Sequence, residues 1–244
     1  MRRLTKRPAL PGATSRKLAA ETTKILSAGD RKKEAERLFN NARKAKWFEP
    51  VTAALARMSG VAERCMFCSG SESSDVEHFW PKADYPERAM TWSNYLWACT
   101  PCNRCKSSRF PLDSAGRPVL IDPASEDVWK FFYIDRFGNL TPRFDMATND
   151  FNYRARETLG ILGLDDRQAV QEARKLRMNE LTLMVKDSLA RLKTGQLTEA
   201  QVRLRIKHWL KSPAQPDVAD YFLNGPGRSE NPFRKLFTAL GSPL

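Results

Sequence analysis

The chain has 244 residues, 41% of them hydrophobic, and a formal net charge of +13. This hydrophobic content is enough for a packed core and excludes wholesale disorder, and the length allows one large domain or two small ones. No run approaches the ~18 apolar residues of a membrane span, so no membrane segment is predicted. The basic charge favours a polyanionic partner, nucleic acid first and an anionic membrane surface second, although a merely soluble basic protein is also compatible with it. We expect a soluble cytoplasmic protein.

Residues 1–60 form a strongly basic region that the pattern predicts to be helical. Residues 1–13 contain two prolines and a glycine, which indicates an extended or mobile arm. Ser15, Asp30 and the Glu49-Pro50 pair are typical starts of helices, and Gly60 is a typical stop. The expected helices therefore cover 15–27, 31–47 and 49–60. Their basic side chains could face phosphate, or they could be an ordinary solvated surface.

Residues 61–112 contain two Cys-x-x-Cys pairs, which are separated by thirty residues. Four thiolates supply the tetrahedral donor set that structural zinc accepts. In a chain of this size such pairs indicate a reducing compartment and a metal, not a disulfide framework. Cys105 also forms a Cys-x-x-Cys spacing, but we favour a small buried or free thiol there. The predicted ligands of structural Zn²⁺ are Cys65, Cys68, Cys99 and Cys102.

Three polar residues inside and beside the cysteine pairs suit phosphodiester hydrolysis. A hard divalent cation neutralises the phosphate and stabilises the leaving oxygen, and it prefers oxygen ligands. Glu77 and Asn103 supply a carboxylate and an amide oxygen. His78 is a base that titrates near neutrality and could take the proton of an attacking water. Adjacent side chains point apart on an extended strand, so Glu77 and His78 could serve the cation and the water separately.

This segment resembles the HNH nuclease family, also called ββα-metal or His-Me fingers. The resemblance is carried by six positions that agree in order and spacing, within Asp75-Val-Glu-His-Phe-Trp-Pro81, Asn94 and Cys99-x-x-Cys-Asn-x-x-Lys106. It implies a hairpin followed by a helix, His78 as general base, and Glu77 and Asn103 as ligands of catalytic Mg²⁺ or Mn²⁺. Asn94 would pin the loop that orients the histidine, and Lys106 would face phosphate.

Two positions depart from the usual family pattern, and one neighbouring residue keeps two readings. The last motif residue is Asn103 instead of histidine, a change that keeps an oxygen ligand. Glu77 stands where aspartate is frequent, which leaves the ligand geometry open. Asp75 could be a further oxygen near the metal or a support for the hairpin.

Residues 113–147 read as a small β extension, and residues 148–244 as a helical region. Arg117 to Ile121 and Val128 to Asp135 are strand-like, and Gly138-Asn139 offers a turn before a partner strand. Helices are expected to end at Gly163 and to start after Asp165 and Thr198, while 211–230 reads as a loop with a short apolar patch. A last helix is expected over 232–240. The whole chain is thus an α+β protein, mainly helical, with a small zinc-stapled module between helical flanks.

Short motifs outside the nuclease segment carry a wider resemblance. They are Glu77-His-Phe-x-Pro-Lys82, Phe110-Pro111, Leu120-Ile-Asp-Pro123, Arg154-Ala155 and Leu162-Gly-Leu164. With these motifs the chain resembles the HNH proteins of bacterial anti-phage systems of the Septu and retron type. The resemblance implies phage defence and an ATPase partner that licenses cleavage. The target would be nucleic acid, DNA before RNA.

Two other functions remain open at this stage. A non-catalytic zinc-ribbon adaptor would need the cysteines and the basic flanks but not His78 or Asn103. A stand-alone restriction-type nuclease would read bases with its C-terminal part, where no base-reading motif is visible.

Several other side chains have both a functional and an ordinary reading. His208 fits an exposed or half-buried helical position. Aromatic residues near the motif could stack bases or fill the core beside the zinc, and two arginines could contact phosphate. These residues are Trp80, Trp92, Trp97, Arg104 and Arg109.

Overall fold

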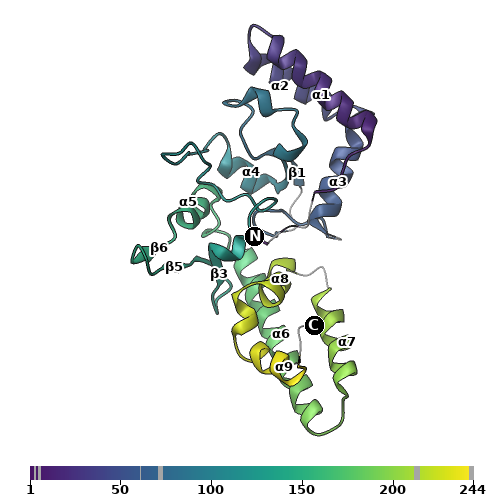
Figure 1. Ribbon diagram of the computed structural model, residues 1–244, viewed down its shortest axis with the longest axis vertical. Helices are drawn as coiled ribbons and strands as arrows, with labels where there is room; N and C mark the ends of the chain where they lie inside the picture. The colour runs from purple at the N-terminus through teal and green to yellow at the C-terminus, as the bar shows by residue number, and fades with distance from the viewer. Residues whose placement is uncertain (3, 5–6, 61, 71–73, 212–214, 242–244) are drawn as a thin grey trace.

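The structure is a computed structural model, and it describes residues 1–2, 4, 7–60, 62–70, 74–211 and 215–241. It is an α+β fold that is mainly helical, as the sequence predicts. Figure 1 shows an elongated molecule in which the chain up to about residue 162 forms one part and the helices from residue 168 onward form the other. Within the described residues, none of the helices combines the length and the apolarity that crossing a membrane requires.

A hairpin and a helix lie at the centre of the first part. Strand β1 (Ser74–His78) pairs antiparallel with β2 (Tyr95–Cys99), so that His78 lies opposite Tyr95. Helix α4 (Thr100–Lys106) follows β2 without a linker, with a proline in its first turn. This is the order of elements that the nuclease resemblance implies.

Three N-terminal helices pack on this hairpin and its connecting loop. Asp30 caps the second helix through the amide of Lys33, and Gly60 ends the third at φ 94°, both as predicted. The first helix starts earlier than predicted, directly after Pro11, and not at Ser15. The helices are α1 (Gly12–Ser27), α2 (Arg31–Ala42) and α3 (Glu49–Ser59).

The second helix is shorter than the predicted 31–47. A turn after Ala42 leads into a 3₁₀ segment, Lys46–Phe48. This break carries Phe48 into the core, where its ring lies 6.0 Å from that of Phe39 and 5.8 Å from that of Tyr95. Burial of the aromatic ring outweighs the continuation of a polar helix.

The predicted strand at 117–121 is wrong. This segment forms a single bridge between Leu112 and Pro118 and continues as a loop. Two of its backbone groups bond to the 111–113 segment: the amide of Val119 donates to the carbonyl of Pro111, and the carbonyl of Arg117 accepts from the amide of Asp113. Others bond to side chains of a later helix: Thr158 accepts from the amide of Ile121, and Arg154 donates to the carbonyl of Leu120. Such partners replace a strand neighbour.

The strand predicted at 128–135 is confirmed only in its second half. Its first half is a 3₁₀ turn that Asp127 caps, and β3 (Phe132–Ile134) then pairs with β4 (Leu140–Pro142). The turn at Gly138 is confirmed, with φ 84°. The partner strand ends before Phe144, which instead starts a second small hairpin.

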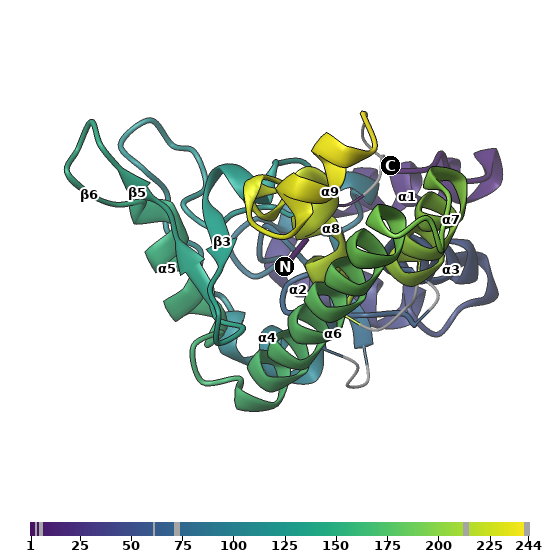
Figure 2. The same cartoon turned by 90° about the horizontal axis from the view of Figure 1, so that it is seen from below.

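That second hairpin, absent from the sequence prediction, lies at one edge of the molecule (Figure 2). It pairs β5 (Phe144–Asp145) with β6 (Asp150–Phe151). It leads directly into the helical region.

Five further helices complete the described chain. Gly163 ends the first in the left-handed conformation, and Thr198 forms a capping box on the third, both as predicted. Asp165 is not a cap, because the second begins after Arg167. The fourth, α8, lies where the sequence indicated a loop. They are α5 (Tyr153–Leu162), α6 (Gln168–Lys193), α7 (Glu199–Leu210), α8 (Pro216–Asn224) and α9 (Phe233–Ala239).

A buried arginine joins the two parts of the molecule. Arg174 of α6 donates from Nε to Asp217 of α8 at 2.7 Å and from Nη2 to the carbonyl of Cys68 at 2.8 Å. Its side chain is only 1% exposed. Buried charges are costly unless they are paired and hydrogen-bonded, so this pair requires α6, α8 and the first cysteine pair to stay together. The division into domains at 1–60, 61–112, 113–147 and 148–244 stays a prediction.

Candidate metal and catalytic centre

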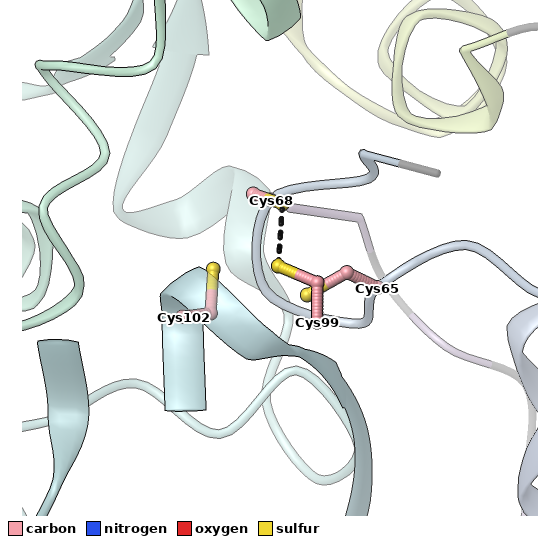
Figure 3. A group of neighbouring side chains, drawn as sticks. All are labelled: Cys65, Cys68, Cys99 and Cys102. Carbon is pink, nitrogen blue, oxygen red and sulfur yellow. Dashed lines mark hydrogen bonds between the residues drawn. The ribbon is translucent and has the colours of Figure 1, made fainter. Parts of the chain in front are cut away.

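The four cysteines predicted as zinc ligands converge on one point (Figure 3). Their Sγ atoms all lie within 4.8 Å of one another, and all four residues are buried. The Sγ atoms of Cys68 and Cys99 are 3.7 Å apart, which matches the roughly 3.8 Å edge of a tetrahedron with Zn–S bonds of about 2.3 Å. The donor set therefore fits a zinc ion, which would fix the turn before β1, the end of β2 and the start of α4 relative to one another.

Donors from outside the cysteine pairs surround this four-cysteine cluster. The amide of Gly70 donates to Cys68 Sγ at 3.2 Å. The guanidinium of Arg167 lies 3.8 Å from Cys102 Sγ and 3.9 Å from Cys99 Sγ. Burial opposes the charge of Arg167, but the neighbouring thiolates outweigh it and raise the pKa of this residue. Sequence reasoning missed Arg167 because it follows the last cysteine ligand by 65 positions.

The four thiols act on one another: their mutual hydrogen bonds lower the pKa values of Cys68 and Cys99 and raise that of Cys102, and burial raises the pKa of Cys65. The thiolate is the form that binds a metal.

Lys106 does not face solvent or phosphate, so that prediction is wrong. Its side chain is fully buried, and its Nζ donates to Glu77 Oε1 and to the carbonyl of His78, both at 2.7 Å. Desolvation of a buried ammonium forces it to take a carboxylate partner. Lys106 thereby holds α4 against β1 and fixes the Glu77 side chain. Burial raises the pKa of Glu77, although Lys106 acts in the opposite direction.

His78 lies on the opposite face of β1 from Glu77, as the strand geometry predicts. Its Nε2 is 2.9 Å from the carbonyl oxygen of Ala89, which also accepts from the hydroxyl of Tyr95 at 2.8 Å. A carbonyl can only accept, so Nε2 carries the proton and Nδ1 keeps its lone pair. Burial lowers the pKa of His78 to about 3, which keeps the imidazole neutral near pH 7. The ring of Phe39 from α2 lies 4.4 Å away and covers one side of it.

Asn94 pins the loop between the strands, as the resemblance implies. Its Oδ1 accepts from the amide of Trp80 at 2.7 Å, and its Nδ2 donates to the carbonyls of Trp80 and Arg88, each at 3.0 Å. Arg88 immediately precedes Ala89, the residue that holds the imidazole. The asparagine thus links the two stretches of the loop that flank the His78 side chain, one at Trp80 and one at Arg88.

Asn103 is half-buried on α4, three residues before Lys106. Residues at this spacing share a helix face, and Lys106 defines that face as the one toward Glu77. The Asn103 amide has no hydrogen bond to the part of the chain that the structure describes, and Lys106 binds Glu77 through Oε1. Carboxylate and amide oxygens are the ligands that magnesium and manganese prefer, so a catalytic cation at Glu77 and Asn103 stays a prediction.

Asp75 and Arg109 have structural partners. Asp75 forms an ion pair with Arg43 at the end of α2, which favours its reading as a support of the hairpin. Arg109 donates to the carbonyls of Cys105 and Ile161, so it links α4 to α5.

The aromatic residues and the remaining candidates have ordinary surroundings. The Trp80 ring packs against Phe110 at 4.7 Å, and the Trp92 indole donates to the carbonyl of Pro8. Trp97 packs against the core. Arg104 and His208 are exposed, and Cys105 is half-buried.

Lys82 is a cation near the catalytic candidates to which sequence reasoning gave no role. Its Nζ lies 5.7 Å from the Phe39 ring centroid, and its charge acts on both Glu77 and His78. The side chain is half-exposed and has no carboxylate partner within the described residues. Its place in the sequence, directly after Pro81 of the motif, could have indicated that this lysine lies near the site.

Comparison with known proteins gives one partial relative. No protein-family model matches the chain. The chain is 32% identical over 96 residues to the Septu protein PtuB of Bacillus thuringiensis, in a match that covers 36% of this chain. The matched part spans about a third of the length of that relative, 35%. This distant similarity to a Septu protein is consistent with the outer motifs noted in the sequence.

Proposed function

We propose that this protein is a metal-dependent HNH endonuclease that hydrolyses DNA phosphodiester bonds. One observation supports this most: a neutral histidine, held through Nε2 by Ala89, stands beside Glu77 within a hairpin and helix whose cysteines could hold zinc. A general base needs a fixed orientation and a nitrogen that can accept a proton. The contact of Nε2 with Ala89 fixes the ring and leaves Nδ1 as that nitrogen.

The residues divide the chemistry between them. His78 accepts the proton of the attacking water at Nδ1. Glu77 and Asn103 would hold Mg²⁺ or Mn²⁺, which neutralises the phosphate and stabilises the leaving oxygen. Lys82 contacts the scissile phosphate in the role that the sequence assigned to Lys106. Lys106 is a positioning residue for Glu77.

The biological setting is a further part of the proposal. The similarity to a protein named Septu protein PtuB supports an anti-phage role. The resemblance of the outer motifs adds an ATPase partner that licenses cleavage. The net charge of +13 suits a nucleic-acid substrate.

The test compares the two histidines of the chain. Plasmid DNA is incubated with Mg²⁺ or Mn²⁺ and with wild type, His78→Ala or His208→Ala, with and without a partner ATPase where one is encoded beside the gene. We expect His78→Ala to lose cleavage by roughly 10²-fold or more and His208→Ala, exposed on α7, to cleave like wild type. Equal cleavage by wild type and His78→Ala would refute the assignment.

A second function, a non-catalytic zinc-ribbon adaptor, is favoured by one observation. Glu77 is already neutralised by Lys106, so a second cation competes with an ammonium for the same carboxylate. On this reading the protein binds nucleic acid with every variant of His78 and cleaves under no divalent metal, with or without a partner.

A further inference from the structure

The cavity of interest has a volume of about 760 Å³, and the loop that carries Trp80 and Asn94 forms part of its wall. This volume is within the roughly 300–1,000 Å³ range of small-molecule sites and exceeds what a lone phosphate needs. Its walls come from the N-terminal arm, the loop between β1 and β2, the 113–126 loop and the start of α5. No residue of the proposed catalytic chemistry other than Asn94 lines it.

The carboxylates that line this cavity already have ion-pair or hydrogen-bond partners within the protein. Asp113 pairs with Arg117 at 2.9 Å, and Glu126 binds Arg154 through both carboxylate oxygens at 2.7 and 2.9 Å. Asp122 accepts from the amide of Ala124 and the hydroxyl of Ser125. These carboxylates therefore need no cation from a ligand, and two of the four lining arginines are neutralised by them.

The other two arginines retain donors. Both terminal nitrogens of Arg7 are shielded from water and have no hydrogen-bond partner within the described residues. Its guanidinium lies 5.0 Å from the Trp92 ring centroid, and that of Arg88 lies 4.1 Å from the Trp80 centroid. Arg88 also forms a long ion pair with Glu87, at 3.9 Å. A guanidinium packed on an aromatic face keeps its N–H edge for an acceptor-rich group such as a carboxylate or a phosphate.

The carboxylates of the cavity are paired and arginine N–H donors are available, so the cavity favours an anionic ligand. The charge of Asp122 acts on Arg7, but the two terminal nitrogens of this guanidinium still have no hydrogen-bond acceptor in the described residues. A phosphate would supply acceptors to Arg7 and to Arg88. The apolar walls at Phe79 and Trp80 leave room for the sugar and base attached to that phosphate. These two residues directly follow His78, so the cavity and the proposed catalytic centre share one loop.

We propose that this cavity binds a nucleotide, with its phosphate on Arg7 and Arg88. The nucleotide comes either from the bound strand, next to the scissile phosphate, or from a free mononucleotide. The strand source rests on the proposed function, since it makes the cavity part of the substrate path.

Binding is measured without cleavage, so the outcome does not depend on nuclease activity. The full-length, zinc-loaded His78→Ala protein is titrated with a short single-stranded DNA oligonucleotide and with deoxyadenosine monophosphate, without added Mg²⁺ or Mn²⁺. The same titrations are repeated with Arg88→Gln and with Arg7→Gln/Arg88→Gln in that background. The matched control is Arg136→Gln, whose guanidinium packs on Phe137 outside the cavity.

We expect each glutamine in the cavity to weaken binding roughly tenfold, since hydrogen bonds to charged groups contribute about 1.5–3 kcal/mol. The oligonucleotide's salt dependence should flatten by about 0.7 in log–log slope for each lost contact. Binding of both ligands indicates a free-nucleotide site, and binding of the oligonucleotide alone indicates the strand. Arg88 is exposed, so Arg88→Gln tests the site even if the Arg7 variant does not fold. Two results would overturn the proposal: an affinity of Arg88→Gln equal to that of the His78→Ala parent, or no binding of either ligand to that parent.

Discussion

The four-cysteine cluster and the candidate catalytic centre use the same hairpin and helix but differ in what they leave available. Around the cluster every thiol is buried, and Gly70 and Arg167 add donors from outside. In the catalytic centre His78 keeps the lone pair of Nδ1 and Asn103 keeps its amide. A closed site fixes the shape, and the neighbouring site retains the free groups that a reaction needs.

The largest expected effect comes from removing a ligand of the cluster. Structural zinc contributes about 10–16 kcal/mol in small zinc domains, which equals or exceeds the usual total stability of about 5–15 kcal/mol. Cys99→Ser should therefore lose bound zinc and the cooperative thermal transition, measured by metal analysis and circular dichroism. Cys105→Ser is the control and should keep one zinc per chain. Retention of zinc by Cys99→Ser would contradict the predicted ligand set.

The next effect concerns the connection between the cluster and the C-terminal helices. Arg174→Ala leaves Asp217 buried without its guanidinium partner, and removal of one partner of a buried pair costs about 3–5 kcal/mol. The free energy of unfolding in urea measures this loss. Lys175→Ala, on the exposed side of α6, is the matched control and should change stability by less than about 0.5 kcal/mol. Similar values for both variants would show that the buried pair does not join the two parts.

Asn94→Ala tests whether the catalytic centre depends on its loop more than on the cluster. The change removes the side-chain bonds to Trp80 and Arg88 and leaves buried backbone groups unpaired, at a cost of about 1–3 kcal/mol. We expect zinc content to stay and cleavage to fall, because His78 loses its fixed orientation. Asn224→Ala, an exposed residue whose amide donates to Asp220, is the control. If Asn94→Ala lost its zinc but kept full cleavage, Asn94 would support the four-cysteine cluster and not the catalytic centre.

The smallest effect is expected at Arg167. Groups around a metal site typically change its affinity by about 10–100-fold when removed. Arg167→Gln should release zinc at a lower chelator concentration than wild type does. The fold of the zinc-loaded protein without chelator should stay unchanged. Arg156→Gln, which loses only an exposed ion pair with Asp150, should behave like wild type. An unchanged chelator curve for Arg167→Gln would remove this residue from the metal site.

Features that depend on a few neighbouring residues could be read from the sequence. The Asp30 and Thr198 caps and the stops at Gly60 and Gly163 are correct, because each satisfies backbone groups within its own turn. The strand predicted at 117–121 is wrong because side chains of α5 bind several of its backbone groups, which local propensity does not reveal.

The sequence by itself determined the two cysteine pairs and the order of the motif residues along one hairpin and one helix. The resemblance that these residues carry also implied that the Asn94 side chain holds its loop. Only the tertiary structure decided that Lys106 is buried against Glu77, that Phe39 covers His78 and that Arg167 reaches the thiolates. These contacts join segments far apart in the chain. Their energies come from desolvation and pairing of charges, which depend on what surrounds a residue and not on its neighbours in sequence.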